Sequence, residues 1–136
     1  MKLSSRWAAA GALPIIMMAM IPSAARADPC AAPLPRAGTT FSGVVRYVGD
    51  GDSLCVGPRD RPERWIEVRL ADFSAPELNE RGGQRAKALL RSVAMGRTLV
   101  CKAGRRSYDR IVAVCTLAGT PIGTELRRRG GQEGGR

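Results

Sequence analysis

The sequence predicts a mainly β protein with some α-helix: a five-stranded Greek-key β-barrel of the OB type, with one inserted helix and a short C-terminal helix. Three observations lead to this fold class. Short β-branched and aromatic segments recur along the chain, and turn residues separate them. A single segment with helical periodicity falls between the third and fourth of these segments. The chain has 136 residues, which suits one domain.

The first 27 residues have the features of a secretory signal peptide. Lys2 and Arg6 precede an uncharged apolar run that is short and is interrupted by Pro14, so it fits a membrane span poorly. Ala25-Arg26-Ala27 supplies small residues for cleavage before Asp28. A short membrane anchor is the alternative. We therefore expect an exported protein, periplasmic or secreted, with no stable membrane association.

Composition narrows the function classes. Three of the 22 basic residues lie in the expected signal peptide, so 19 remain against 12 acidic residues in a mature chain of 109. A net charge near +7 on so small a body favours a polyanionic partner, which is nucleic acid, anionic lipid or a wall polymer; solubility is the alternative reason for the charge. The chain has no histidine, which excludes Ser-His-Asp triads, histidine-dependent nucleases and H-E-x-x-H zinc enzymes. We expect a monomer.

The four cysteines predict two disulfides, because an even number in a small exported chain usually pairs completely. Three connectivities are possible. Cys101 and Cys115 lie on strands that we expect to be neighbours, which favours the pair Cys101–Cys115. The pair Cys30–Cys55 would then tie the N-terminal leader to the barrel.

The leader and the strands follow in order. Residues 28–40 are rich in proline and alanine and predict an extended leader. Strands are expected at residues 41–48, 53–56, 65–70, 98–101 and 111–117. An Asp-Gly turn joins the first two strands, and the basic loop KAGRRSYDR joins the last two.

Two helices complete the pattern. The inserted helix has an apolar stripe with i, i+3, i+4 spacing and ends at Gly96; the stripe consists of Ala86, Leu89, Leu90, Val93 and Ala94. In the C-terminal helix, Thr120 is the expected N-cap and Pro121 the first helical residue, and Gly130-Gly131 ends it. Residues 132–136 are expected to form a frayed tail.

Three short segments of the sequence carry residues suited to chemistry on phosphates. They are Gly49-Asp50-Gly51-Asp52-Ser53, the segment RLADFSAPE from Arg69 to Glu77, and Tyr108-Asp109-Arg110. In order and spacing they resemble the D-G-D-[TS], R-L-x-x-[VI]-D-[AT]-P-E and Y-G-R motifs of the staphylococcal nuclease (thermonuclease) family. The resemblance covers about residues 41–131. It implies an exported nuclease that hydrolyses phosphodiester bonds of DNA, RNA or both with the help of calcium.

The resemblance also implies a role for each matched residue. Asp52 would be a ligand of Ca²⁺, a hard cation that prefers carboxylate oxygens. Glu77 would be the general base that takes a proton from the attacking water. Arg69 and Arg110 would hold phosphoryl oxygens and stabilise the charge of the transition state. Tyr108 would contact a phosphate or sugar of the bound strand.

The chain departs from the family pattern at two of these places. Ser74 stands where the family has a second calcium-binding aspartate, and a hydroxyl is a much weaker calcium ligand than a carboxylate. Asp72 lies two residues earlier, on the same face of a straight strand, and is the substitute that the sequence offers. Asp109 replaces a glycine beside Arg110. We therefore expect a weak calcium site built from Asp52, with Asp72 and Ser74 as tentative members.

The alternative function is a non-catalytic OB-fold module that binds nucleic acid or another polyanion. Taken singly, Arg69 and Glu77 could form a surface ion pair, Asp52 could be a turn residue, and Arg110 and Tyr108 could be ordinary hairpin residues. A pure binder, however, has no need of this trio of Arg69, Glu77 and Arg110 together. It would also use exposed aromatic residues for stacking, and these are few.

Overall fold

A computed structural model describes residue 11 and residues 28–134 of the chain. The expected signal peptide, apart from Gly11, lies outside the described residues, as do the last two residues of the tail. The elements are β1 (Thr40–Asp50), β2 (Ser53–Val56), η1 (Pro62–Arg64), β3 (Ile66–Leu70), α1 (Gly83–Ala94), β4 (Thr98–Ser107), β5 (Arg110–Leu117), β6 (Thr120–Pro121) and α2 (Ile122–Arg128). Within these ranges no helix has the length and apolarity needed to cross a membrane.

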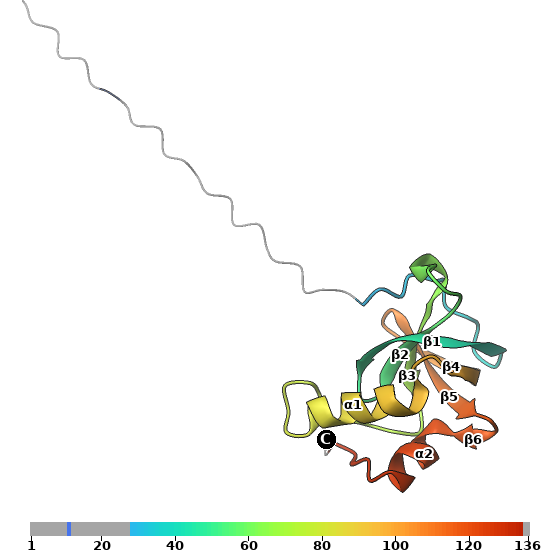
Figure 1. The fold of residues 1–136 in the computed structure, drawn as a ribbon. Helices are drawn as coiled ribbons and strands as arrows, with labels where there is room; N and C mark the ends of the chain where they lie inside the picture. The colour runs from blue at the N-terminus through green and yellow to red at the C-terminus, as the bar shows by residue number, and fades with distance from the viewer. Residues whose placement is uncertain (1–10, 12–27, 135–136) are drawn as a thin grey trace, which may run out of the picture.

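The sheet is mainly antiparallel, which confirms a mainly β fold with two α-helices. Its strand order is β3-β2-β1-β4-β5-β6, and β3 also pairs with β5 in parallel. The additional pairing means that β1, β2, β3, β5 and β4 are linked in a ring that returns to β1 (Figure 1). Residues 66–70 and 110–117 are thus neighbours in space although α1 and β4 separate them in the sequence.

The core fills the inside of this strand ring and the space beneath the helices. It consists of alternate strand residues, among them Val45, Leu54, Val68, Leu70, Leu99 and Ile111. On α1, Leu90, Val93 and Ala94 are buried, as the helical periodicity predicted. On α2, Ile122 and Leu126 are buried. Each helix therefore contributes one apolar stripe to the core.

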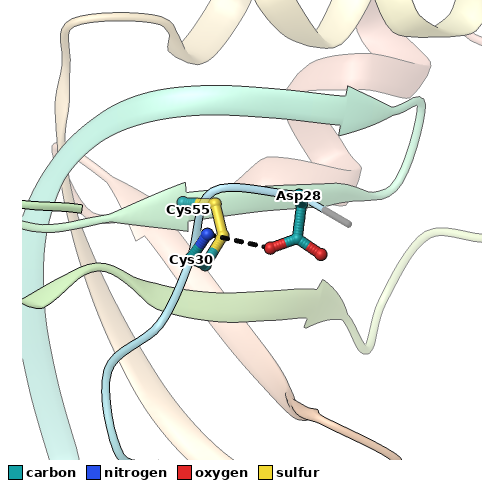
Figure 2. Close-up of side chains that lie close together, drawn as sticks. All are labelled: Asp28, Cys30 and Cys55. Carbon is teal, nitrogen blue, oxygen red and sulfur yellow. Dashed lines mark hydrogen bonds between the residues drawn. A yellow bond between two sulfur atoms is a disulfide. The ribbon is translucent and has the colours of Figure 1, made fainter. Parts of the chain in front are cut away.

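Both expected disulfides are present. Cys101 and Cys115 are directly opposite each other on β4 and β5, with a Cα–Cα distance of 4.0 Å. Cys30 bonds to Cys55 of β2 across a Cα–Cα distance of 5.8 Å. Figure 2 shows that this second bond holds the leader over the strands and brings Asp28 with it, since the Cys30 amide donates a hydrogen bond to the Asp28 carboxylate (2.9 Å).

Strand β4 is longer than the sequence predicted. It continues to Ser107, so the expected basic loop is reduced to the turn at Tyr108-Asp109. The cause is visible in the alternation, because Cys101 and Ala103 are buried while Lys102 is exposed. The polar residues that resembled a loop belong to this strand, which has an irregularity between Ala103 and Arg106.

The start of α2 corrects a second prediction. Thr120 is not an N-cap; it pairs with Leu117 as part of β6, and the helix begins at Ile122 without a cap from its own side chains. Asp72 takes that role from a distant segment, because its Oδ2 accepts a hydrogen bond from the Gly123 amide (3.0 Å). A carboxylate at a helix N-terminus satisfies an otherwise unpaired N–H group.

The described residues of the expected frayed tail have defined partners. A carboxylate oxygen of Glu133 accepts hydrogen bonds from the Ser74 amide (3.1 Å) and from Arg127 (3.2 Å). The Gly134 amide donates to the Ser74 carbonyl (2.8 Å). The tail at residues 132–134 therefore packs against the segment that follows β3.

Candidate active site

The turn between β1 and β2 is ordered by Asp50. Its Oδ1 accepts hydrogen bonds from the Asp52 amide (3.0 Å) and from the Ser53 hydroxyl (2.7 Å). Burial alone would raise the pKa of Asp50, but these bonds and the charge of Arg110 lower it overall. Asp50 is therefore ionised at neutral pH and shapes the turn as a fixed anion.

Asp52 is the buried carboxylate of the site, with only 4% of its surface exposed. Its Oδ2 accepts a hydrogen bond from the Ala75 amide (2.8 Å) and lies 3.1 Å from the Arg69 guanidinium. Burial, together with repulsion from Asp50, raises the pKa of Asp52 to about 6, against the lowering effect of Ala75 and Arg69. Strong perturbation by burial and by a like charge is typical of functional carboxylates.

Arg69 connects Asp52 to the segment that follows β3. In addition to the ion pair, its guanidinium donates hydrogen bonds to the Leu70 carbonyl, to the Phe73 carbonyl (2.8 Å) and to the Ser74 hydroxyl (3.1 Å). These hydrogen bonds hold the backbone of residues 70–74 curved around the Arg69 side chain. Arg69 is consequently a positioned cation, and three of its partners are neutral oxygens that an anionic ligand could replace.

Arg110 reaches the same region from β5. The parallel register pairs Val68 with Ile111, both buried, so Glu67 and Arg110 lie together on the outer face of the ring. The positive charge of Arg110 acts on both Asp50 and Glu67, since it lowers the pKa of each carboxyl. Arg110 of the third segment therefore acts on Asp50 of the first, which precedes it by 60 residues in the chain.

Glu77 lies on the exposed segment between β3 and α1. It opens a turn in which the Glu80 amide donates to the Glu77 carbonyl (2.9 Å) and the Glu77 amide donates to the Glu80 carboxylate (3.1 Å). Gly83 packs against this turn so closely that a Cβ there would clash with the Glu77 carbonyl. Two residues before Glu77, the Ala75 amide is bound to Asp52, which ties this turn to the buried carboxylate.

Tyr108 lies at the tip of the β4–β5 hairpin and is 90% exposed. Its backbone has φ of +56°, in the left-handed region, and its carbonyl accepts a hydrogen bond from Arg106 (2.9 Å). The hairpin geometry thus presents an aromatic ring to solvent two residues before Arg110. An exposed ring in this place is available for stacking or for contact with a sugar.

The calcium expectation concerns the donors near Asp52. Asp50 and Asp52 place two carboxylates so close that they repel each other, and a cation would relieve this repulsion. Ser74 lies beside Arg69, which already supplies positive charge to Asp52. Asp72 is engaged with α2, and its Oδ1 is buried without a hydrogen-bond partner in the described structure. The weak calcium site expected from Asp52, with Asp72 and Ser74, therefore stays a prediction, and Arg69 would compete with a cation for Asp52.

A second group of carboxylates was not predicted as part of a site. Oxygens of Asp28, Glu67 and Asp109 all lie within 4.8 Å of one another, on the leader, β3 and the hairpin turn. Partial burial, with repulsion from Asp28 and Asp109, raises the pKa of Glu67 to about 7, and Arg110 opposes this. The alternation of β3 placed Glu67 outward, but only the pairing of β3 with β5 and the Cys30–Cys55 bond bring the three together.

No protein-family model and no curated protein matches the chain.

Proposed function

We propose that the protein is a nuclease that hydrolyses phosphodiester bonds of DNA, RNA or both. One observation carries this proposal: segments 50–53, 69–77 and 108–110 converge at one part of the strand ring. The contacts are the Asp52–Arg69 ion pair, the bond from Ala75 to Asp52 and the charge of Arg110 beside Asp50. Carboxylates and two guanidinium groups in one place are what phosphodiester hydrolysis requires.

In this proposal the side chains divide the chemistry among them. Arg69 and Arg110 bind two phosphoryl oxygens and stabilise the charge that develops on them. Glu77 accepts a proton from the attacking water, and Tyr108 contacts the strand next to the scissile phosphate. Asp52, with Asp50, would hold a calcium ion. When bound, such an ion polarises a phosphoryl oxygen and lowers the pKa of a coordinated water.

The proposal includes a fold assignment and a setting. The ring order β1-β2-β3-β5-β4, with α1 inserted between β3 and β4, supports an OB-type barrel. The two disulfides support an oxidising compartment, and with the signal-like N-terminus they favour export to the periplasm or beyond. We propose that the protein acts there as a monomer.

A direct test is digestion of plasmid DNA and of RNA by the mature protein, with calcium or with a chelator. The expected result is cleavage that depends on calcium and falls by ~10²–10⁴-fold in Glu77→Gln, because a general base contributes that much. Glu63→Gln is the control, since Glu63 is exposed and pairs with Arg61 outside the site. Full activity of Glu77→Gln would contradict the assignment of the base.

A second candidate, a non-catalytic binding module, is favoured by one observation. The guanidinium of Arg69 is already bonded to Asp52, Phe73 and Ser74, as a purely structural arginine would be. In that case purified protein would retain labelled single strands in a gel and leave them intact with calcium present. Intact strands after prolonged incubation would establish this second function in place of the first.

A further inference from the structure

A groove runs between α1 and the C-terminal tail, with a volume of about 820 Å³. One wall is the start of the helix with Pro76, and the other is the chain after α2, from residue 129 to residue 134. The two walls are held together by contacts at both ends, since Gly131 packs against Leu89 and Gly134 against Pro76. In Figure 1 the described part of the chain after α2 runs toward the beginning of α1. The groove is therefore built by ordered parts of the fold.

Three arginines line this groove: Arg81, Arg85 and Arg129. All three are exposed, and none forms an ion pair within 4.0 Å with another residue in the described part of the chain. The first turn of α1 contains no acidic residue, so the helix dipole adds to this positive potential. The three arginines outnumber the two acidic residues that line the groove, Glu80 and Glu133, so the groove keeps an excess of positive charge.

The acidic residues of the groove are engaged with other partners. A carboxylate oxygen of Glu133 accepts bonds from Arg127 and from the Ser74 amide, and these lower the pKa of Glu133. The carboxylate of Glu80 accepts a bond from the Glu77 amide. Charge complementarity consequently favours a polyanion along this groove, and not a cation or a neutral ligand.

The position of the groove relates it to the candidate active site. Pro76 lines the groove, and the next residue is Glu77, the proposed general base. We propose that the groove binds the phosphate backbone of a single nucleic-acid strand as it leaves the active site, through Arg81, Arg85 and Arg129. This inference rests on the proposed function and identifies the substrate as a strand several nucleotides long.

The chemistry of the groove also defines how the strand is recognised. Guanidinium groups bind phosphates without regard to base identity, and the floor offers Ala86 and Leu89 in place of aromatic rings. The volume is that of a small-molecule pocket, which accepts a few nucleotides of one strand and excludes a duplex. Binding through this groove is therefore independent of sequence, dependent on strand length and sensitive to salt.

The test compares the binding of fluorescein-labelled oligothymidylates of 4 and 16 nucleotides, in chelator so that no cleavage occurs. The variant combines Arg81→Gln, Arg85→Gln and Arg129→Gln. Its matched control combines Arg36→Gln, Arg59→Gln and Arg97→Gln, which removes equal charge from exposed positions outside the groove. Unfolding midpoints of both variants verify that they are folded.

We expect wild type to bind the 16-mer more tightly than the 4-mer, and the groove variant to lose roughly tenfold in affinity for the 16-mer. The slope of log affinity against log salt should fall by roughly 2, since each lost phosphate contact on a single strand removes about 0.7. The inference is overturned if wild type binds neither strand, or if the control variant loses as much as the groove variant.

The two proposals fail in different ways. If wild type cleaves nucleic acid but the groove variant binds the 16-mer as tightly as wild type, the nuclease proposal stands and the groove proposal falls. If wild type cleaves nothing while the groove variant loses its length-dependent binding, the groove proposal stands and the nuclease proposal falls.

Discussion

The two arginines of the candidate site differ in how the protein holds them. The side chain of Arg69 is 12% exposed and is bonded to a buried carboxylate, two carbonyls and a hydroxyl. Arg110 begins β5 next to an exposed turn, and no ion pair shorter than 4.0 Å joins it to another residue of the described chain. Its influence on Asp50 and Glu67 acts through space.

The two arginines therefore differ in how much each contributes to stability and to the binding of a phosphate. Arg69 contributes to the fold and to the site, because removing it leaves Asp52 buried beside Asp50 without its cation. Arg110 contributes to the site and forms no ion pair in the described chain, so its guanidinium can turn toward a ligand with little loss of stability. Stability and activity should therefore respond differently to the loss of each arginine.

The largest effect is expected from Arg69→Ala. Nuclease activity should fall ~10²–10³-fold, as when one transition-state donor is removed, and stability should fall by about 3 kcal/mol near pH 8. The pKa of Asp52 is already raised and would rise further, so the cost should be smaller at pH 5, where the carboxyl is protonated. Denaturant unfolding at both pH values measures this. A cost independent of pH would contradict the assigned role of the ion pair.

Replacement of Arg110 should lower activity and leave stability nearly unchanged. We expect Arg110→Ala to reduce the rate of cleavage by a similar ~10²–10³-fold with a change in stability below about 0.5 kcal/mol. Arg105→Ala is the control, since it is an exposed arginine of the same hairpin. The readouts are initial rates on a labelled single strand and the denaturant midpoint. If Arg110→Ala destabilised the protein as much as Arg69→Ala, the proposed division between the two arginines would be wrong.

Ser74→Asp tests whether position 74, which contacts Arg69, also faces the expected calcium site. A carboxylate at position 74 would draw the guanidinium toward itself and add a second charge for a cation near Asp52, so calcium should bind about tenfold more tightly. Ser74→Asn, which adds no charge, is the control. Calorimetric titration of calcium into each variant gives the affinities. Unchanged affinity in Ser74→Asp would mean that position 74 does not face the metal.

The smallest effect concerns Glu67, which Arg110 faces together with Asp28 and Asp109. Its pKa of about 7 lies above the ordinary 4.5, so the folded state binds its proton more tightly than the unfolded state. The resulting stability is present below pH 4.5 and is lost as the pH rises through 7. Glu67→Gln should remove this loss, which amounts to about 1 kcal/mol after solvent screening. The free energy of unfolding of the variant should therefore depend less on pH between pH 5 and 8. Glu63→Gln is an exposed control.

Much of the fold was predictable because it depends on local patterns. The stripe of α1, the turn at Gly51-Asp52 and the opposition of Cys101 and Cys115 all follow from periodicity or from neighbouring strands. The end of β4 and the start of α2 were not predictable in this way. Arg106 has loop-like polarity and Thr120 has cap-like chemistry, but their strand partners, Ile111 and Leu117, decided their conformation.

The site was predictable as far as motifs defined it, and not where it depended on tertiary contacts. Asp52 and Arg69 were named from the sequence, and the structure joins them in an ion pair. The engagement of Asp72 with the Gly123 amide was not evident, because 51 residues separate the two. The same holds for Asp28 beside Glu67, which requires the leader to be held in place by a disulfide.

The unequal burial of the two disulfides has a consequence for the protein under reducing conditions. Cys101 and Cys115 are both almost fully buried, so a thiolate can reach them only when the ring itself opens. Cys30 lies on the partly exposed leader and can be attacked while the strands remain paired. Reductants would therefore break the Cys30–Cys55 bond first and free Asp28 to move away from Glu67 and Asp109. The rest of the leader would stay attached through the backbone hydrogen bonds that the Ala31 and Ala32 amides donate to the carbonyls of Pro62 and Trp65.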